Sequence, residues 1–269
     1  MISCPYTARW AVVCCAFALL ATGRGSADAA STTNVVQTTH GPITGLVEDG
    51  IHTFKGIRYG APPVGELRFM PPQKPAPWTD PYAAIEYGQS AIQMATGASA
   101  NPTTELSKQL ATVFTTSLEM KTNEEDCLFL NVWTPGIDDR KRPVMVWLHG
   151  GGYAYGSGSW PVYDGHNLAE KGDLVVVTVN HRLNAFGYLH LAEIGGEKYA
   201  RSGNAGMLDL VLMLEWVRDN IGAFGGDPGN VTIFGESGGG AKVSTLLAMP
   251  AAVGLFHKAI IQSGPGLTG

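Results

Sequence analysis

The chain has 269 residues, of which 45% are hydrophobic and 15% charged, a balance that excludes disorder throughout and allows one large buried core. Its net charge of −5 and the lack of any lysine or arginine cluster remove the electrostatic basis for binding nucleic acid or an anionic membrane surface. Small neutral or cationic partners fit this charge better.

The first thirty residues differ from the rest of the chain. Arg9 precedes the apolar run 10–21, and Ala27-Asp28-Ala29 is a small-x-small cleavage site, so residues 1–29 are predicted to be a secretory signal peptide. The apolar run is shorter than the roughly 20 residues of a membrane span. An uncleaved anchor is the alternative. We expect a mature domain of residues 30–269 that is secreted or periplasmic, with no stable membrane insertion.

Cysteine usage agrees with this division. Cys4, Cys14 and Cys15 would leave with the signal peptide, so that the mature chain keeps only Cys127. An internal disulfide is then impossible, and a domain of this size does not need one.

The first part of the mature chain predicts strands and then irregular structure. Residues 35–55 roughly alternate between apolar and polar around turn signals at 40–42 and 48–50, which predicts an antiparallel meander. The proline-rich residues 61–81 predict an irregular surface segment. Residues 89–124, with a weakly amphipathic stretch at 104–120, are interpreted as a loop or lid that contains a short helix.

After residue 124, short apolar runs alternate with helical patterns. Strands are predicted over 128–133, 144–148, 174–180, 231–234 and 258–262, and a helix over 162–171. Apolar residues at spacings of three and four predict one face of a second helix, at Met207, Leu210, Leu214, Val217 and Ile221. Such alternation implies parallel strands covered on both faces. We therefore predict one α/β domain, with a mostly parallel sheet after an antiparallel meander.

Two glycine-rich turns follow two of these strands. The strand 231–234 runs into Gly235-Glu236-Ser237-Gly238-Gly239, the pattern of a nucleophile elbow, in which a strained serine stands clear of a strand-to-helix turn. The strand 144–148 runs into His149-Gly-Gly-Gly152, whose amides could bind an oxyanion. Gly151, Gly152 and Gly238 are the predicted donors, and such donors typically contribute about 3 to 4 kcal/mol each.

The chain resembles the type-B carboxylesterase family, the cholinesterase-like branch of the α/β-hydrolases. The stretch 125–132, Glu-Asp-Cys-Leu-Phe-Leu-Asn-Val, carries this likeness together with residues 224–239, 54–59 and 62–69, and it extends over nearly all of residues 35–269. The resemblance implies the α/β-hydrolase fold, with Ser237 as acyl nucleophile and Gly151, Gly152 and Gly238 as the oxyanion hole.

The same resemblance assigns supporting residues. Glu236 would lie near the active site and favour cationic character in the pocket, or it would only pack the elbow. Ser263 stands where the family has a serine that supports the triad acid. Buried ion pairs are expected between Arg68 and Glu125 and between Arg182 and Asp209.

Two departures from the family pattern carry expectations of their own. Family members often have alanine at the position of Gly238, so the turn is expected to be looser, with little effect on the chemistry. Ala91 stands where many relatives have a cysteine that pairs with the cysteine of the Glu-Asp-Cys motif. Cys127 is therefore expected to be a buried free thiol.

The histidine and carboxylate that a serine nucleophile needs are not identifiable. In α/β-hydrolases they follow the serine, yet the only later histidine is His257, at a predicted surface helix end, and no Asp or Glu follows Glu236. His149 belongs to the glycine-run loop. The other histidines are expected to be solvated or capping, namely His40, His52, His166, His181 and His190. The triad acid and base are expected beyond residue 269, and the chain alone is expected to be inactive.

The sequence thus predicts a serine carboxylic-ester hydrolase that acts on a small-molecule ester and requires no metal or cofactor. A catalytically silent cholinesterase-like binding domain, or an inactive fragment, is the alternative. The hormone-sensitive-lipase type also has His-Gly-Gly-Gly but lacks the 125–132 stretch. Tyr153, Tyr155 and Trp160 would line the entrance or simply pack. Neither the particular ester nor the oligomeric state follows from the sequence.

Overall fold

A computed structural model describes residues 31–93, 104–105, 108 and 123–264. The predicted signal peptide, residues 1–29, and most of the predicted helix at 104–120 lie outside these ranges. Both stay predictions.

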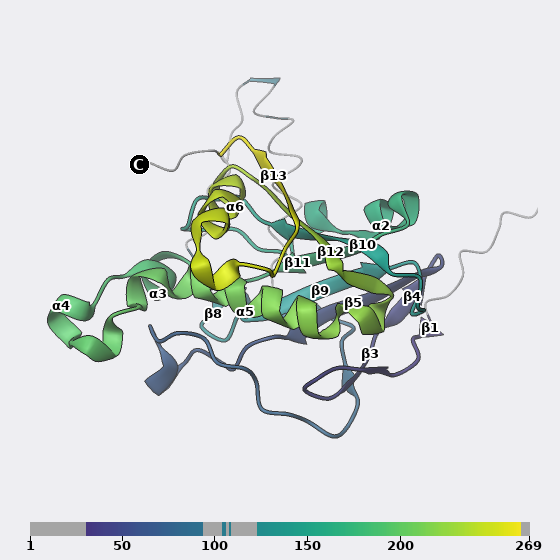
Figure 1. Cartoon of the computed structure of the whole chain (residues 1–269), viewed down its shortest axis with the longest axis horizontal. Helices are drawn as coiled ribbons and strands as arrows, with labels where there is room; N and C mark the ends of the chain where they lie inside the picture. Colours follow the sequence, from purple (N-terminus) through teal and green to yellow (C-terminus); the bar gives the residue numbers. More distant parts are fainter. Residues whose placement is uncertain (1–30, 94–103, 106–107, 109–122, 265–269) are drawn as a thin grey trace, which may run out of the picture.

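The fold is built on one eight-stranded sheet with the order β1-β4-β5-β9-β11-β10-β12-β13 (Figure 1). β1, β4, β5 and β9 pair in antiparallel fashion, whereas β11, β10, β12 and β13 are parallel. The strands are β1 (Ser31–Thr32), β4 (Leu46–Glu48), β5 (Ile51–Arg58), β9 (Phe129–Thr134), β11 (Val175–Val179), β10 (Arg142–Leu148), β12 (Gly226–Glu236) and β13 (Lys258–Gln262). The predicted mostly parallel sheet with an antiparallel N-terminal part is confirmed.

In the part of the chain that the structure describes, two small sheets accompany the large one. β2 (Val36–Gln37), β3 (Pro42–Thr44) and β6 (Tyr82–Ala83) form one, and β7 (Ser90–Ala91) and β8 (Asn123–Glu124) form the other. The predicted meander is therefore shared between two sheets, because β2 and β3 pair apart from β4 and β5. Residues 61–81 are irregular as predicted, apart from the 3₁₀ turn η1 (Gly65–Leu67).

Helices cover both faces of the large sheet. On one face α5 (Ala205–Asn220) and α6 (Gly238–Ala248) pack with Val177 and Val132 in the main core. On the other face Ala169 of α2 (His166–Gly172) joins Val176 and Trp133 in a second cluster. Neighbouring strand residues point to opposite faces, so Val176 and Val177 belong to different cores. All five residues of β11 are buried, as a doubly covered parallel strand requires.

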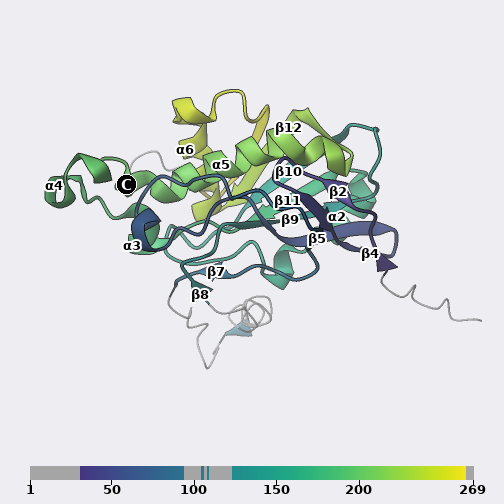
Figure 2. The same ribbon diagram turned by 90° about the horizontal axis from the view of Figure 1, so that it is seen from below.

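The remaining helical segments within residues 123–264 are short. α3 (Asn184–Tyr188) and α4 (Ala192–Gly195) extend beyond the end of the sheet, as Figures 1 and 2 show from two directions. The 3₁₀ turns are η2 (Pro161–Tyr163), η3 (Glu197–Tyr199), η4 (Ser202–Asn204), η5 (Ile221–Phe224) and η6 (Pro250–Ala252).

The helix predicted over 162–171 is interrupted. η2 ends at Tyr163, Asp164 has a non-helical backbone, and its carboxylate accepts the amide of His166 at 2.8 Å, where α2 begins. An aspartate that caps a backbone amide competes with helix continuation, and this explains the break. α5 is buried on nearly every side, whereas the sequence pattern had marked one face. Within the described residues, no helix is long and apolar enough to cross a membrane.

Candidate active site

The two predicted functional turns begin at the same edge of the sheet. β10 and β12 are parallel neighbours, and Leu148 at the end of β10 pairs with Gly235 near the end of β12. Because the carboxyl ends of parallel strands share one edge, the glycine run at 149–152 and the elbow at Ser237 leave the sheet side by side. Ligands bind at this edge in open α/β sheets.

Ser237 has the strained backbone of a nucleophile elbow. Its φ of 55° and ψ of −120° are rare for a residue with a side chain, and the residue is exposed. Its amide donates to the carbonyl of Gln262 at 2.9 Å, and its own carbonyl accepts the amide of Ala241 at 3.0 Å. A Cβ on Gly235 would lie 2.5 Å from the carbonyl carbon of Gly239, so the crossing backbones need glycine there, as predicted.

The glycine run lies against this elbow. Gly151 and Gly152 have φ angles of 89° and 63°, and a Cβ on Gly238 would overlap the nitrogen, Cα and carbonyl oxygen of Gly152. A Cβ on Gly150 would lie 3.6 Å from Cβ of Ser237. Two of the predicted donors, Gly152 and Gly238, are thus in backbone contact. Their role in binding an oxyanion stays a prediction.

Gly238 is packed closely against the glycine run, and the expectation of a looser turn stays a prediction. The absent Cβ allows the glycine run to approach the start of α6 more closely than an alanine would permit. The consequence is tighter packing between the loop and the elbow.

The two supporting residues also lie at this edge. The carboxylate of Glu236 is exposed, and its Oε2 is 3.3 Å from where a Cβ of Gly150 would stand. Burial, and then the charge of Glu236, raise the pKa of Tyr163 to about 12. Ser263, with a φ of 54°, directly follows β13, whose Gln262 pairs with Glu236. The roles given to Glu236 and Ser263 stay predictions.

The aromatic residues expected at the entrance divide into two kinds. Tyr155 is 42% exposed and is available to a ligand. Trp160 is buried, and its ring stacks on that of Tyr163. The ring of Tyr153 packs edge-on against that of Tyr188, with 4.9 Å between the ring centroids. For Trp160 and Tyr153 the structure gives packing roles.

Two histidines are more buried than the sequence suggested. His149 and His181 are 1% and 0% exposed, and their rings stack at 4.9 Å. Burial, followed by the charge of Lys242, holds the pKa of each imidazole well below its ordinary 6.5. The expectation of a solvated or capping His181 is therefore wrong, because its ring fills the space beside the glycine-run loop.

His257 has a structural contact. It is exposed, and its Nδ1 accepts the amide of Val231 at 3.1 Å, which fixes the start of β13 against β12. Within the described part of the chain, no histidine is hydrogen-bonded to Ser237. The sequence assigned no catalytic base here, and the described residues supply none.

Comparisons with known proteins agree with this geometry. Residues 32–269 match the carboxylesterase family. The chain belongs to the carboxylesterase family. It is 47% identical over 237 residues to the para-nitrobenzyl esterase of Bacillus subtilis, which covers 88% of this chain and 45% of that protein. It is 41% identical over 244 residues to the liver carboxylesterase of Sus scrofa, covering 87% of this chain and 40% of that protein.

A solved structure is similar as well. The carboxylesterase of Geobacillus stearothermophilus superposes with a TM-score of 0.74 at 44% identity, covering 85% of this chain and 43% of that one. The α/β-hydrolase fold is therefore confirmed. The present carboxylesterase-family chain spans less than half the length of these relatives.

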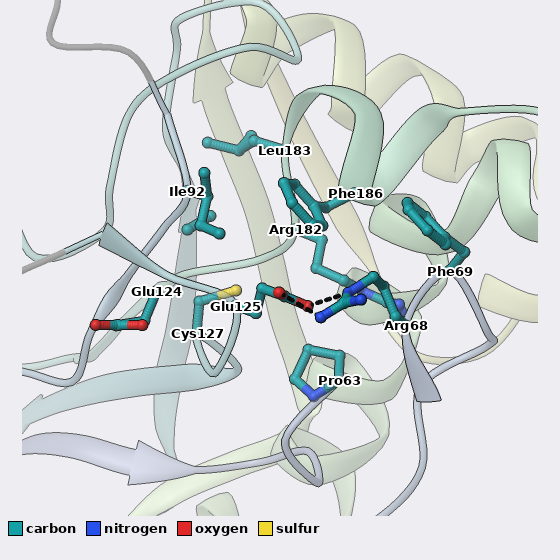
Figure 3. Close-up of a pocket in the computed structure, with 11 residues that line it drawn as sticks. Pro63, Arg68, Phe69, Ile92, Glu124, Glu125, Cys127, Arg182, Leu183 and Phe186 are labelled. Carbon is teal, nitrogen blue, oxygen red and sulfur yellow. Dashed lines mark hydrogen bonds and ion pairs between the residues drawn. The ribbon is translucent and has the colours of Figure 1, made fainter. Parts of the chain in front are cut away.

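The two ion pairs expected from the family resemblance differ in burial. Arg182 and Asp209 form the predicted buried pair, with side chains 4% and 0% exposed. Arg68 and Glu125 also pair, at 2.6 Å, but the arginine side chain is 42% exposed. The expectation that this second pair is buried is therefore wrong; its two side chains line a small pocket (Figure 3).

Cys127 lies in the same pocket. It is a buried free thiol, as predicted, and burial raises its pKa. Ala91, at the position of the expected partner cysteine, also lines the pocket. The pocket does not contain the predicted catalytic residues, Ser237, Gly151, Gly152 and Gly238.

Lys242 was not singled out from the sequence. It follows Ser237 by five residues on α6, is fully buried, and donates from Nζ to the carbonyl of His149 at 3.0 Å. A signal was present, since a lysine stands in the first half of a helix of otherwise small and apolar residues. A cation is unfavourable near the positive end of a helix dipole, so a lysine at this position indicates a role other than helix stabilisation.

Proposed function

We propose that the protein is a serine carboxylic-ester hydrolase that works through an acyl-enzyme. The observation that carries this proposal is the conformation of Ser237, an exposed serine with a φ of 55° at the end of β12, beside a glycine run with positive φ angles. Membership of the carboxylesterase family supports it. We propose the class of its substrate, a small-molecule carboxylic ester, and not a particular ester.

In the proposed reaction, Oγ of Ser237 attacks the ester carbonyl carbon. The carbonyl oxygen becomes negative and is held by the amides of Gly151, Gly152 and Gly238, and the alcohol leaves as the acyl-enzyme forms. Water then hydrolyses the acyl-enzyme. The proton of Ser237 requires a histidine oriented by a carboxylate, and we place both in the part of the protein that corresponds to the remainder of the relatives.

The test uses the protein produced from the full-length gene. With p-nitrophenyl butyrate as substrate, Ser237→Ala is expected to lower kcat by about six orders of magnitude, as loss of a triad member can. Ser244→Ala is the matched control, because its hydroxyl only donates to the carbonyl of Gly240 within the same helix. A fluorophosphonate probe should label the parent at Ser237. Undiminished turnover in Ser237→Ala, or labelling elsewhere, excludes this mechanism.

We also propose that the protein is exported. The support is the apolar run at 10–21 and the Ala27-Asp28-Ala29 site, both from the sequence. Expression in a bacterial host should yield a protein in the periplasm or medium whose first residue is Ala30. A protein that keeps Met1 and stays in the cytoplasm contradicts the proposal.

A further inference from the structure

The start of α6 is packed against the loop that carries the glycine run. A Cβ on Gly238 would overlap Gly152, and a Cβ on Gly239 would overlap the carbonyl oxygen of Leu148. Lys242 lies one helical turn further on, on the same side of α6, and its Nζ donates to the carbonyl of His149 at 3.0 Å. Gly238 and Lys242 of the nucleophile helix thus contact the loop, and Gly239 contacts the end of β10.

Lys242 contacts the loop on both sides of the glycine run. His149, whose carbonyl it binds, directly precedes the run, and Tyr153, whose ring centroid lies 5.8 Å from Nζ, directly follows it. An ammonium near an aromatic face is attracted to the ring, and the attraction increases when water is excluded. One side chain therefore connects both ends of the run to the helix that begins at Ser237.

This lysine is buried in a place that does not favour a charge. It is 0% exposed and makes no salt bridge among the described residues. Its basic neighbours are the stacked imidazoles of His149 and His181, whose Nε2 atoms are buried without a hydrogen-bond partner. A buried ammonium without a carboxylate costs stability, so its presence beside a candidate active site indicates a function.

The glycine run needs such an attachment. Gly151 and Gly152 have positive φ angles, and glycine restricts its own backbone less than other residues do. Amides that bind a developing oxyanion are effective only if they are held in place before the reaction. Gln93 and Asn184 hold the loop further along, at Gly156 and Tyr153, but neither belongs to the nucleophile helix.

We propose that Lys242 is a positioning residue, which fixes the glycine run relative to Ser237 by binding the carbonyl of His149. This inference rests on the proposed ester hydrolysis at Ser237. It assigns to Lys242 no contact with substrate. The residue acts through the amides of Gly151 and Gly152, which it keeps at the place where the oxyanion forms.

The experiment compares Lys242→Met and Lys242→Gln with the parent, all produced from the full-length gene. Methionine keeps much of the volume and removes both the charge and the donor, whereas glutamine keeps a donor. We expect kcat for p-nitrophenyl butyrate to fall about 10- to 100-fold in Lys242→Met, with KM within about threefold, because a misplaced oxyanion donor affects the transition state. Lys242→Gln should fall between Lys242→Met and the parent.

Two further measurements separate positioning from stability. At about pH 6, below the lowered pKa of Lys242, the melting temperature of Lys242→Met should equal or exceed that of the parent, since a buried charge is removed. The rate of fluorophosphonate labelling should fall in parallel with kcat. Thr245→Ala is the control, because its hydroxyl donates to the carbonyl of Ala241 within α6, and it should behave like the parent.

The outcomes are distinct. Turnover of Lys242→Met within twofold of the parent overturns the inference, and so does a loss of activity that is matched by a lower melting temperature in both variants. If Lys242→Met does not fold, a folded Lys242→Leu with parental kcat overturns it, because leucine also lacks the donor to the carbonyl of His149. Parental activity in Ser237→Ala instead removes the proposed function itself.

Discussion

The guanidinium of Arg182 forms a bidentate ion pair with the carboxylate of Asp209. Nε donates to Oδ2 at 2.9 Å and one terminal nitrogen donates to Oδ1 at 2.6 Å, while the backbone amide of Arg182 adds a third bond to Oδ2 at 3.0 Å. The other terminal nitrogen donates to the carbonyl of Met70 at 2.8 Å. The pair therefore ties the loop after β11 to α5 and to the irregular segment 61–81.

The buried ion pair should be far more sensitive to substitution than the exposed one. Asp209→Asn leaves the Arg182 charge buried and unpaired, and we expect it to lower the free energy of unfolding by about 3 to 5 kcal/mol. Glu125→Gln is the matched control, since its partner Arg68 is solvated, and the effect there should be much smaller. Urea unfolding of both variants checks this. Equal losses of unfolding free energy in the two variants would show that burial does not determine how much each ion pair contributes to stability.

Much of the fold could be predicted from the sequence because local signals and long-range pairing agree. The runs at 144–148 and 174–180 are apolar on both faces, as expected of a strand that is covered on both sides, and both are strands of the central sheet. The elbow was predictable because Gly-x-Ser-x-Gly after a strand has one backbone solution. Where a capping side chain interrupts a helix, as Asp164 does, periodicity gives no warning.

The site was predicted in its residues but not in its surroundings. Whether a histidine is solvated depends on what packs over it, and nothing near His181 in the sequence indicates the imidazole of His149 that covers it. The same holds for Arg68, whose pair with Glu125 was expected from the resemblance but whose 42% exposure depends on how the fold packs around it. Burial depends on the assembled fold. A family resemblance therefore predicts which residues pair more readily than it predicts how deeply they are buried.

The stability of the protein should depend on pH through Lys242. Burial lowers the pKa of this lysine from 10.5 to about 7. Between those values the unfolded chain binds the proton and the folded protein does not, so the free energy of unfolding rises with pH across this window. The slope approaches about 1.4 kcal/mol per pH unit. In Lys242→Met this contribution should be absent.

The measurement is urea unfolding of the parent and Lys242→Met between pH 7 and about 8.5. Above the ordinary thiol value of 9.0 the raised pKa of buried Cys127 has the opposite sign, because the unfolded thiol ionises first. His149 and His181 stay neutral in the folded protein across this range, and their unfolded-state contribution cancels between the two proteins. Parallel pH curves for the two proteins would contradict the prediction.

Gly238 should be intolerant of the alanine that the family resemblance leads one to expect there. The added Cβ would overlap backbone atoms of Gly152, which cannot swing aside as a flexible side chain can, so the glycine run must shift. A donor displaced by a fraction of an ångström stabilises an oxyanion less well, and we expect kcat to fall about 10- to 100-fold, with a smaller change in KM.

Gly222→Ala is the matched control for Gly238→Ala, because no atom lies within 4 Å of where its Cβ would stand. Both variants, produced from the full-length gene, are assayed with p-nitrophenyl butyrate and by the rate of fluorophosphonate labelling. Gly222→Ala should match the parent in both measurements. A Gly238→Ala protein with parental kcat would show that the glycine run has room to move without loss, and that close contact with the elbow does not hold its amides in place.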